Sequence, residues 1–253
     1  MAKIYTIISG KGGTGKTTTA VNLGAALNKF KEDVVIIDAN LTTPNIGLYF
    51  GAPIVPVSLN HVLQGKAGIE EAIYEHDSGT KIIPSSLSSN DLKKVDTTKM
   101  KDASKKLKKL TNFVLLDSAA GLGDEAKFAI ESGDEMIVVV NPNILSVTDA
   151  LKAIKLAEDF NKNVKGAIIT RVKGEKTEMS LSNIKDMLEV PILGIVPEDK
   201  AVDESLAKKD AVIHTKPRSK ASKAYMNIAA KLLGKQKIPV SLFERFLESI
   251  GLR

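Results

Sequence analysis

Cysteine is absent from this chain of 253 residues. Its absence excludes disulfides, thiolate metal sites, iron–sulfur clusters and cysteine nucleophiles, and it makes a reducing cytoplasm the expected location. No apolar stretch reaches the roughly 18 residues that a membrane-spanning helix needs, and the first residues lack the layout of a signal peptide. We therefore expect a protein that neither spans a membrane nor is exported.

Aromatic residues and arginine are also scarce. Aromatic residues make up 4% of the chain, and arginine occurs at Arg171, Arg218, Arg245 and Arg253. This scarcity counts against base stacking and groove readout of nucleic acid. The net charge of +6 comes mostly from lysine, and it suits nucleic acid, an anionic bilayer or a polyphosphate nucleotide equally well.

Short apolar runs recur along the chain and are separated mostly by helical patterns. They cover residues 4–8, 34–37, 81–83, 113–116, 136–140, 164–169 and 192–196. Near-continuous apolar strands that alternate with helices predict an α/β fold, with a mostly parallel twisted sheet and helices on both faces. We also expect surface helices within residues 65–77 and 90–109. The second segment is lysine-rich, which fits either a solvated helix face or a phosphate-contacting patch.

A phosphate-binding loop of the form G-x-x-x-x-G-K-[ST] follows the first apolar run and precedes a helical pattern. Its residues are Gly10, Lys11, Gly12, Gly13, Thr14, Gly15, Lys16 and Thr17, and Thr18 comes next. Glycines let successive backbone N–H groups point at phosphate oxygens, Lys16 can reach the β- and γ-phosphates, and the Thr17 hydroxyl suits Mg²⁺. The loop predicts a three-layer P-loop NTPase fold that binds a nucleotide together with Mg²⁺.

Two further apolar runs end in acids. Asp38 follows residues 34–37, with Asn40 two positions later, and Asp117 follows residues 113–116. An acid at a buried strand end must pair or coordinate, because an isolated charge there is costly. Asp117 would lie across the site from Thr17, as in a Walker B strand, and we expect Thr17, Asp38 and Asp117 to hold Mg²⁺.

The run Lys-Gly-Gly-Thr-Gly-Lys-Thr-Thr from Lys11 to Thr18 resembles the deviant Walker A loop of the MinD/ParA family of ATPases. The resemblance is closest to MinD of the archaeal type and extends over roughly residues 2–233. It implies that Lys11 crosses an ATP-dependent dimer interface to the phosphates of the partner subunit, although a solvated loop lysine is the alternative. It also implies that Gly121 supplies a backbone N–H toward the γ-phosphate.

Asn40 departs from the family pattern. Many members carry aspartate there, and that aspartate orients or activates the attacking water. Asparagine can hydrogen-bond a water but cannot accept its proton. Asn40 is therefore either a natural variant, which hydrolyses slowly or relies on Asp38, or a deliberate Asp-to-Asn change that traps ATP. Both alternatives predict impaired turnover, with Lys11, Lys16, Asp38 and Asn40 as the catalytic residues.

The resemblance also implies two segments around the adenine. They comprise Thr170 and Arg171 in the first, and Pro197, Glu198 and Asp199 in the second. Thr170 stands where the family usually has asparagine, so base selectivity is less strongly encoded than phosphate binding. Asp149 fits either an interface role or a plain acid in the first turn of a helix.

The composition changes after residue 233. We expect an ATPase domain over residues 1–233, a linker over 234–239 and an amphipathic helix over 240–253. The apolar stripe of this tail consists of Leu242, Phe243, Phe246, Leu247 and Ile250. It resembles the C-terminal membrane-targeting helix of MinD, and the alternative is that it packs on its own domain or on a partner protein. Two copies on an ATP-closed dimer would bind a membrane more firmly than one.

These features predict a MinD-like ATPase switch. Its Mg-ATP-bound homodimer would attach from the cytoplasm to the inner face of the cell membrane and position cell-division or other machinery. Hydrolysis would reset it, with an unidentified activating or cargo protein as a further partner. The alternative is a ParA-like partitioning ATPase that binds nucleoid DNA through lysines; the tail argues against it, so nucleic acid is the less favoured partner.

Overall fold

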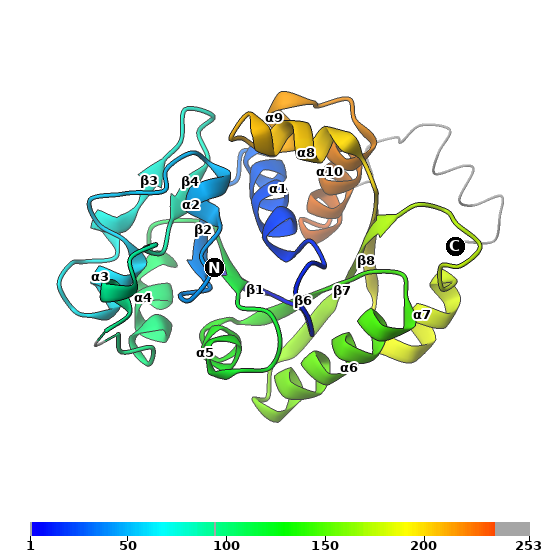
Figure 1. Cartoon of the computed structure of the whole chain (residues 1–253), viewed down its shortest axis with the longest axis horizontal. Coiled ribbons are helices and arrows are strands. Elements are labelled where there is room, and N and C mark those ends of the chain that lie inside the picture. The colour runs from blue at the N-terminus through cyan, green and yellow to red at the C-terminus, as the bar shows by residue number, and fades with distance from the viewer. Residues whose placement is uncertain (1, 94, 236–253) are drawn as a thin grey trace.

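The computed structural model describes residues 2–93 and 95–235, and it contains one eight-stranded sheet (Figure 1). The order of the strands is β3-β4-β2-β5-β1-β6-β7-β8, and every neighbouring pair is parallel except β3 and β4. The strands are β1 (Lys3–Ile8), β2 (Val34–Ala39), β3 (Tyr74–Glu75), β4 (Lys81–Ile83), β5 (Phe113–Ser118), β6 (Glu135–Val140), β7 (Asn163–Val172) and β8 (Ile192–Pro197). This mostly parallel sheet confirms the expected α/β fold.

Helices cover both faces of the sheet, which gives three layers (Figure 1). They are α1 (Lys16–Lys29), α2 (Ile46–Tyr49), α3 (Leu59–Leu63), α4 (Lys99–Leu107), α5 (Asp124–Ser132), α6 (Ile144–Asp159), α7 (Leu181–Leu188), α8 (Lys200–Ala207), α9 (Val212–Thr215) and α10 (Lys220–Leu232), with single 3-10 turns η1 (Glu70–Ala72) and η2 (Ser89–Leu92). Helices α1, α8, α9 and α10 lie on one side, and α4, α5, α6 and α7 lie on the other.

The central strand β1 shows why the strands read as unbroken apolar runs. Tyr5 and Ile7 are buried in the core that includes residues of α1 and α10, whereas Ile4 and Ile8 are buried in the cores of the opposite face. Successive side chains of a strand point to opposite faces, so a strand covered on both sides needs apolar residues at consecutive positions. Burial on both faces therefore keeps β1 in the middle of the sheet, and its carboxyl end leads into the loop before α1.

The expectation of a helix within residues 65–77 is wrong. This segment contains the short turn η1 and the two-residue strand β3, which pairs antiparallel with β4. In residues 90–109 the structure has η2 and α4, and α4 buries Met100, Ala103 and Leu107 on one side. The lysines of α4 lie mainly on the opposite, exposed side, which is the solvated face that amphipathic helices present.

The end of α10 is the last described element. Gly234 adopts φ +65°, the left-handed conformation that commonly ends a helix, and the ammonium of Lys235 lies 5.0 Å from the centre of the Phe30 ring. The remainder of the expected linker and the whole amphipathic tail lie outside the described residues. Within residues 2–93 and 95–235, no helix has both the length and the apolarity to cross a bilayer.

Candidate functional site

The phosphate-binding loop joins the carboxyl end of β1 to the first turn of α1. Gly15 precedes α1 with φ +88°, a backbone conformation that glycine adopts without strain. Gly10 meets a different constraint, because a Cβ built on it would lie 2.0 Å from the carbonyl oxygen of Asp149 in α6. Glycine is therefore required at position 10 for α6 to pack against the loop.

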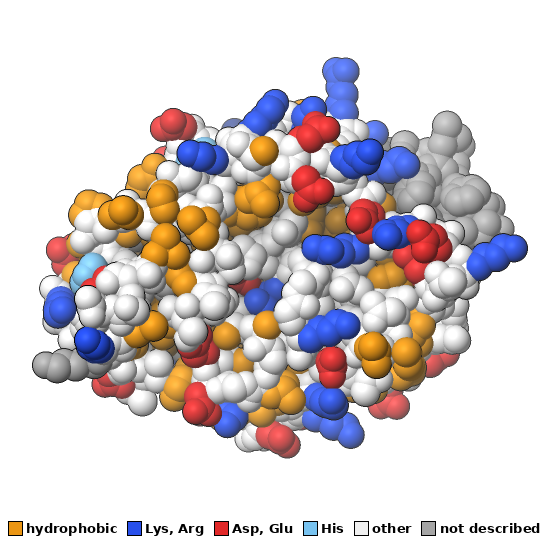
Figure 2. Space-filling model, viewed as in Figure 1, with side chains coloured by type: hydrophobic (Ala, Val, Ile, Leu, Met, Phe, Trp, Pro, Cys, Tyr) orange, Lys and Arg blue, Asp and Glu red, His pale blue; other side chains and the backbone are white. Residues whose placement is uncertain are grey.

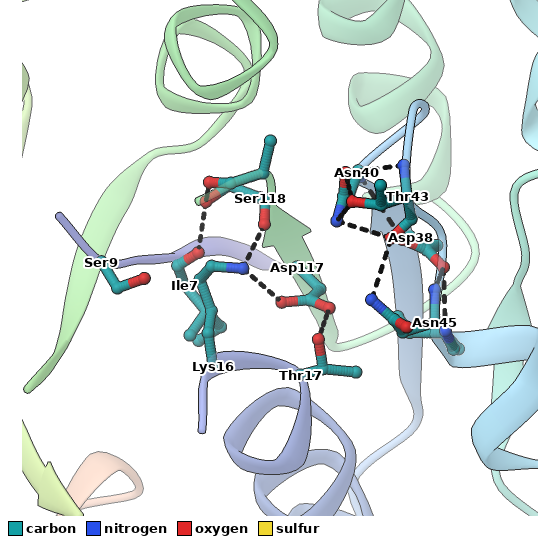
Figure 3. A network of polar contacts seen from close by, with 12 residues as sticks. Ile7, Ser9, Lys16, Thr17, Asp38, Asn40, Thr43, Asn45, Asp117 and Ser118 are labelled. Carbon is teal, nitrogen blue, oxygen red and sulfur yellow. Dashed lines mark hydrogen bonds and ion pairs between the residues drawn. The ribbon is translucent and has the colours of Figure 1, made fainter. Parts of the chain in front are cut away.

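Lys16 and Thr17 both contact Asp117 at the end of β5 (Figure 3). The Lys16 ammonium lies 3.4 Å from Oδ1 of Asp117 and donates a hydrogen bond to the carbonyl oxygen of Ser118. The Thr17 hydroxyl donates to Oδ2 of Asp117 at 2.6 Å. The two residues expected to contact phosphate and Mg²⁺ are thus held on the Walker B carboxylate.

Asp38 and Asp117 are neighbours across the sheet. They are register partners at the carboxyl ends of β2 and β5, and both are at most 1% exposed. Burial, together with the charge of Asp117, raises the pKa of Asp38 to about 8. Burial also raises the pKa of Asp117, although Lys16 and Thr17 oppose that shift. Two buried carboxylates and a hydroxyl are hard oxygen donors, so a divalent cation fits this cluster.

The Asp38 carboxylate also organises the loop that follows β2. Its Oδ2 accepts the backbone N–H groups of Asn45 and Ile46, each at 2.8 Å, and its Oδ1 accepts that of Asn40 at 3.3 Å. Asp38 therefore satisfies backbone donors at the start of α2, as a capping carboxylate does. It holds residues 40–46 beside the oxygens of Asp38 that are expected to bind Mg²⁺.

Asn40 is 8% exposed, and its side chain is closed onto Thr43 (Figure 3). Its Nδ2 donates to the Thr43 carbonyl oxygen at 2.7 Å and lies 2.9 Å from the Thr43 hydroxyl. Its Oδ1 accepts the Thr43 N–H at 3.2 Å. Since a carboxylate has no donor for the carbonyl oxygen, the loop fits an amide at position 40 better than an acid.

Lys11 and Gly121 are the two other residues expected to contact phosphate. The Lys11 side chain is half-buried and makes no hydrogen bond or ion pair with any residue that the structure describes. The Gly121 N–H, expected to face the γ-phosphate, donates to the Ser9 carbonyl oxygen at 3.1 Å. This N–H must leave Ser9 before it can reach a phosphate.

The residues expected around the adenine have structural contacts. The Thr170 hydroxyl donates to the Thr14 carbonyl oxygen at 2.6 Å, so it braces the phosphate-binding loop. Asp199 accepts the N–H groups of Ala201 and Ala221, at the starts of α8 and α10. Of the other candidates, Arg171 and Glu198 are exposed, Arg171 with φ +56°, and Pro197 is buried.

Three further residues at the site were not anticipated from the sequence. Ser118 accepts the Lys16 ammonium through its carbonyl, Thr43 holds Asn40, and Glu125 of α5 binds the loop after Asn40. Ser118 directly follows Asp117, so the strand pattern of residues 113–116 could have placed it at the site. Thr43 and Glu125 act through tertiary or turn contacts that leave no spacing pattern in the sequence.

Comparison with known proteins identifies similar chains. The profile of the family described as CobQ/CobB/MinD/ParA nucleotide binding domain matches residues 5–212. An uncharacterised ATP-binding protein of Methanocaldococcus jannaschii is 42% identical over 234 residues, which cover 92% of this chain and 89% of that protein.

Two solved structures share the whole fold. The cell division ATPase MinD of Pyrococcus furiosus has a TM-score of 0.89 at 33% identity, covering 92% of this chain and 99% of its own. The septum site-determining protein MinD of Pyrococcus horikoshii, in complex with Mg-ADP, has a TM-score of 0.88 at 33% identity, covering 95% of this chain and 100% of its own. Each is a protein to which this chain is similar over nearly its full length.

Proposed function

Since this chain belongs to the MinD/ParA family of nucleotide-binding proteins, we propose that it is a Mg-ATP-dependent molecular switch that hydrolyses ATP slowly. The observation that carries the proposal is that Asp117 forms an ion pair with Lys16 and accepts a hydrogen bond from Thr17, both at the end of the phosphate-binding loop. The Lys16 ammonium and the Thr17 hydroxyl, the groups expected to bind phosphate and Mg²⁺, therefore lie side by side before a nucleotide binds.

Nucleotide binding exchanges the partners of these groups. Lys16 would leave the Ser118 carbonyl for phosphate oxygens, and Thr17 and Asp117 would hold Mg²⁺, which would neutralise phosphate charge. Asp38 would keep its backbone bonds to Asn45 and Ile46 and so fix the loop that would face the γ-phosphate. Positioning and electrostatics, rather than covalent chemistry, are the contribution of these residues.

Asn40 makes hydrolysis slow. Its amide must break the bonds to Thr43 before it can orient a water, and it accepts no proton when it does. The fit between the Asn40 amide and the Thr43 carbonyl supports a natural variant over an aspartate changed to trap ATP. A slow enzyme stays in its ATP-bound state for longer, as a switch requires.

Dimerisation and membrane attachment complete the proposed cycle. Lys11 is half-buried on the loop with its ammonium unpaired among the described residues, which suits contact with the phosphates of a second copy. The apolar stripe of the tail, Leu242, Phe243, Phe246, Leu247 and Ile250, would then attach the dimer to lipid through two copies. Such a switch would position cell-division or other machinery, with an activating or cargo partner still to be identified.

Sedimentation with anionic liposomes tests the proposal in ATP, in ADP and without nucleotide. We expect co-sedimentation in ATP alone, and we expect Phe246→Asp to abolish it while ATP affinity stays unchanged. Ser241→Asp is the matched control, because the helical spacing expected for the tail puts residue 241 opposite the apolar stripe, and we expect it to leave sedimentation intact. Equal sedimentation in all three conditions refutes the switch, and unimpaired sedimentation of Phe246→Asp refutes the membrane role.

A ParA-like DNA partitioning ATPase is the competing outcome. DNA binding with a steep salt dependence, in a protein that ignores liposomes, would favour it. On the face shown in Figure 2, basic side chains are interspersed with acidic ones and form no continuous stripe. This arrangement gives the DNA-binding alternative less support than the site gives the nucleotide switch.

A further inference from the structure

Glu125, the second residue of α5, holds the loop that carries Asn40. Its Oε2 accepts the backbone N–H of Leu41 at 3.0 Å and lies 3.4 Å from that of Thr42. Its Oε1 accepts the hydroxyl of Thr42. One carboxylate therefore binds two consecutive residues that lie more than 80 positions away in the sequence.

The same residue lies four positions after Gly121. The N–H of Gly121 donates to Ser9 at the start of the phosphate-binding loop, and Leu41 directly follows Asn40. Glu125 thus joins the loop that would meet the γ-phosphate from the Walker B side to the loop that would meet it from the β2 side. The connection runs through charge-assisted hydrogen bonds, which are stronger than bonds between neutral groups.

A simple capping role does not account for these contacts. An acid in the first turn of α5 can stabilise the helix dipole without contacting a residue of another loop. Asp124 already supplies such an acid: its side chain is 82% exposed and pairs with Lys127 at 3.0 Å. Glu125 is instead turned toward Leu41, whose buried N–H needs an acceptor because an unpaired buried donor is costly.

We propose that Glu125 is a positioning residue that couples residues 40–45 to residues 118–123, so that the γ-phosphate of ATP moves both loops together. The inference rests on the proposed nucleotide switch and adds the element that connects its two sensing loops. When Gly121 leaves Ser9 for phosphate, the start of α5 shifts with it. Through Glu125 this shift reaches Leu41 and the neighbouring Asn40.

A fluorescent label on a single cysteine makes the coupling measurable, since the chain has no other cysteine. Leu48 is 49% exposed and lies in α2, the helix that directly follows the loop, so Leu48→Cys carries the label outside the site. Its signal is compared in ADP and in a non-hydrolysable ATP analogue, both with Mg²⁺. Calorimetry on the same samples measures nucleotide binding.

We expect the ATP analogue to change the label signal in the parent and Glu125→Ala to lose at least about half of that change. The kcat of Glu125→Ala should fall about tenfold while the KM for ATP stays within about twofold, because mispositioning affects turnover more than binding. Glu125→Gln, which keeps an acceptor oxygen, should lie between the two. Asp124→Ala is the matched control and should behave as the parent in both measurements.

Thr42→Val tests the same coupling without changing any residue of α5. It removes the hydroxyl partner of Glu125, and we expect a smaller loss in the same direction. If Glu125→Ala and Asp124→Ala respond alike while the parent binds ATP, the coupling is refuted and the nucleotide switch stands. If the parent binds no ATP in calorimetry, the proposed function fails and takes the coupling with it.

Discussion

Replacing Asn40 by aspartate exchanges the side-chain NH₂ group, a donor, for an oxygen in a side chain of nearly the same size. In the structure that donor lies 2.7 Å from the Thr43 carbonyl oxygen, so the exchange places two acceptors face to face. The Thr43 N–H, 3.2 Å from Oδ1, can still donate to the new carboxylate. Losing one partly buried bond and gaining a repulsion costs about 1–3 kcal/mol in the nucleotide-free protein.

The new charge also enters an acidic neighbourhood. Asp38 and Asp117 are buried and already have raised pKa values, and the backbone N–H of residue 40 lies 3.3 Å from Asp38. A third carboxylate adds to the same repulsion until a cation relieves it. We therefore expect Mg-ATP to restore most of the stability that Asn40→Asp loses.

Although Asn40→Asp should lower the stability, we expect it to raise the rate of ATP hydrolysis. A carboxylate repelled by the Thr43 carbonyl is free to turn toward the attacking water, and it can accept the proton that asparagine cannot. General-base catalysis contributes about 10²–10⁴-fold in favourable geometry, and we expect an increase in kcat of roughly tenfold or more because the loop is built for an amide.

Urea denaturation with and without Mg-ATP measures the stability, and phosphate release at saturating Mg-ATP measures kcat. Asn45→Asp is the matched control: Asn45 Nδ2 donates to the same Thr43 carbonyl at 2.9 Å, but the residue is exposed. It should lose little stability and leave the rate unchanged. An unaltered rate in Asn40→Asp, or equal effects of the two substitutions, would refute the role assigned to Asn40.

Three further predictions address the carboxylates and the loop. Asp117→Asn should weaken ATP binding about tenfold and make it independent of Mg²⁺, as measured by calorimetry with and without EDTA. In Mg²⁺-free buffer the pKa of Asp38 is about 8 in the folded protein and about 4 in the unfolded chain. The raised pKa therefore stabilises the folded protein fully below about pH 4, and this stabilisation is lost as the pH rises through about 8. The urea midpoint should fall across that range, and Asp38→Asn should flatten the profile. Gly10→Ala should lower the unfolding free energy by about 1–3 kcal/mol, since its Cβ would lie 2.0 Å from the Asp149 carbonyl; an unchanged midpoint would contradict that packing.

The sequence predicts those parts of the fold whose signal is local. Residues 34–37 and 113–116 are unbroken apolar runs, and they form β2 and β5 because both faces of the sheet are covered. Parallel strands share one carboxyl edge, so the closeness of Asp38 and Asp117 also follows from the pattern. By contrast, β3 has two exposed residues and pairs antiparallel at the sheet edge, which leaves no periodicity to detect.

The rest of the site depends on contacts between distant segments. Glu125 meets Leu41 across 84 positions, and Thr170 meets Thr14 across 156. No spacing in the sequence specifies such pairs, because packing of the helices against the sheet brings them together. The amide geometry of Asn40 and Thr43 is local, but Asn40 can point either to Thr43 or toward the ligand, and only the folded loop selects between them.

Calorimetric titration of ATP into the wild-type protein and into Lys16→Ala, each with and without Mg²⁺, tests the nucleotide site most directly. We predict one ATP bound per chain in the wild type, tighter with Mg²⁺, and loss of binding in Lys16→Ala. Absence of heat in the wild type, or equal affinity in the two proteins, would contradict the assignment of this loop as the phosphate site.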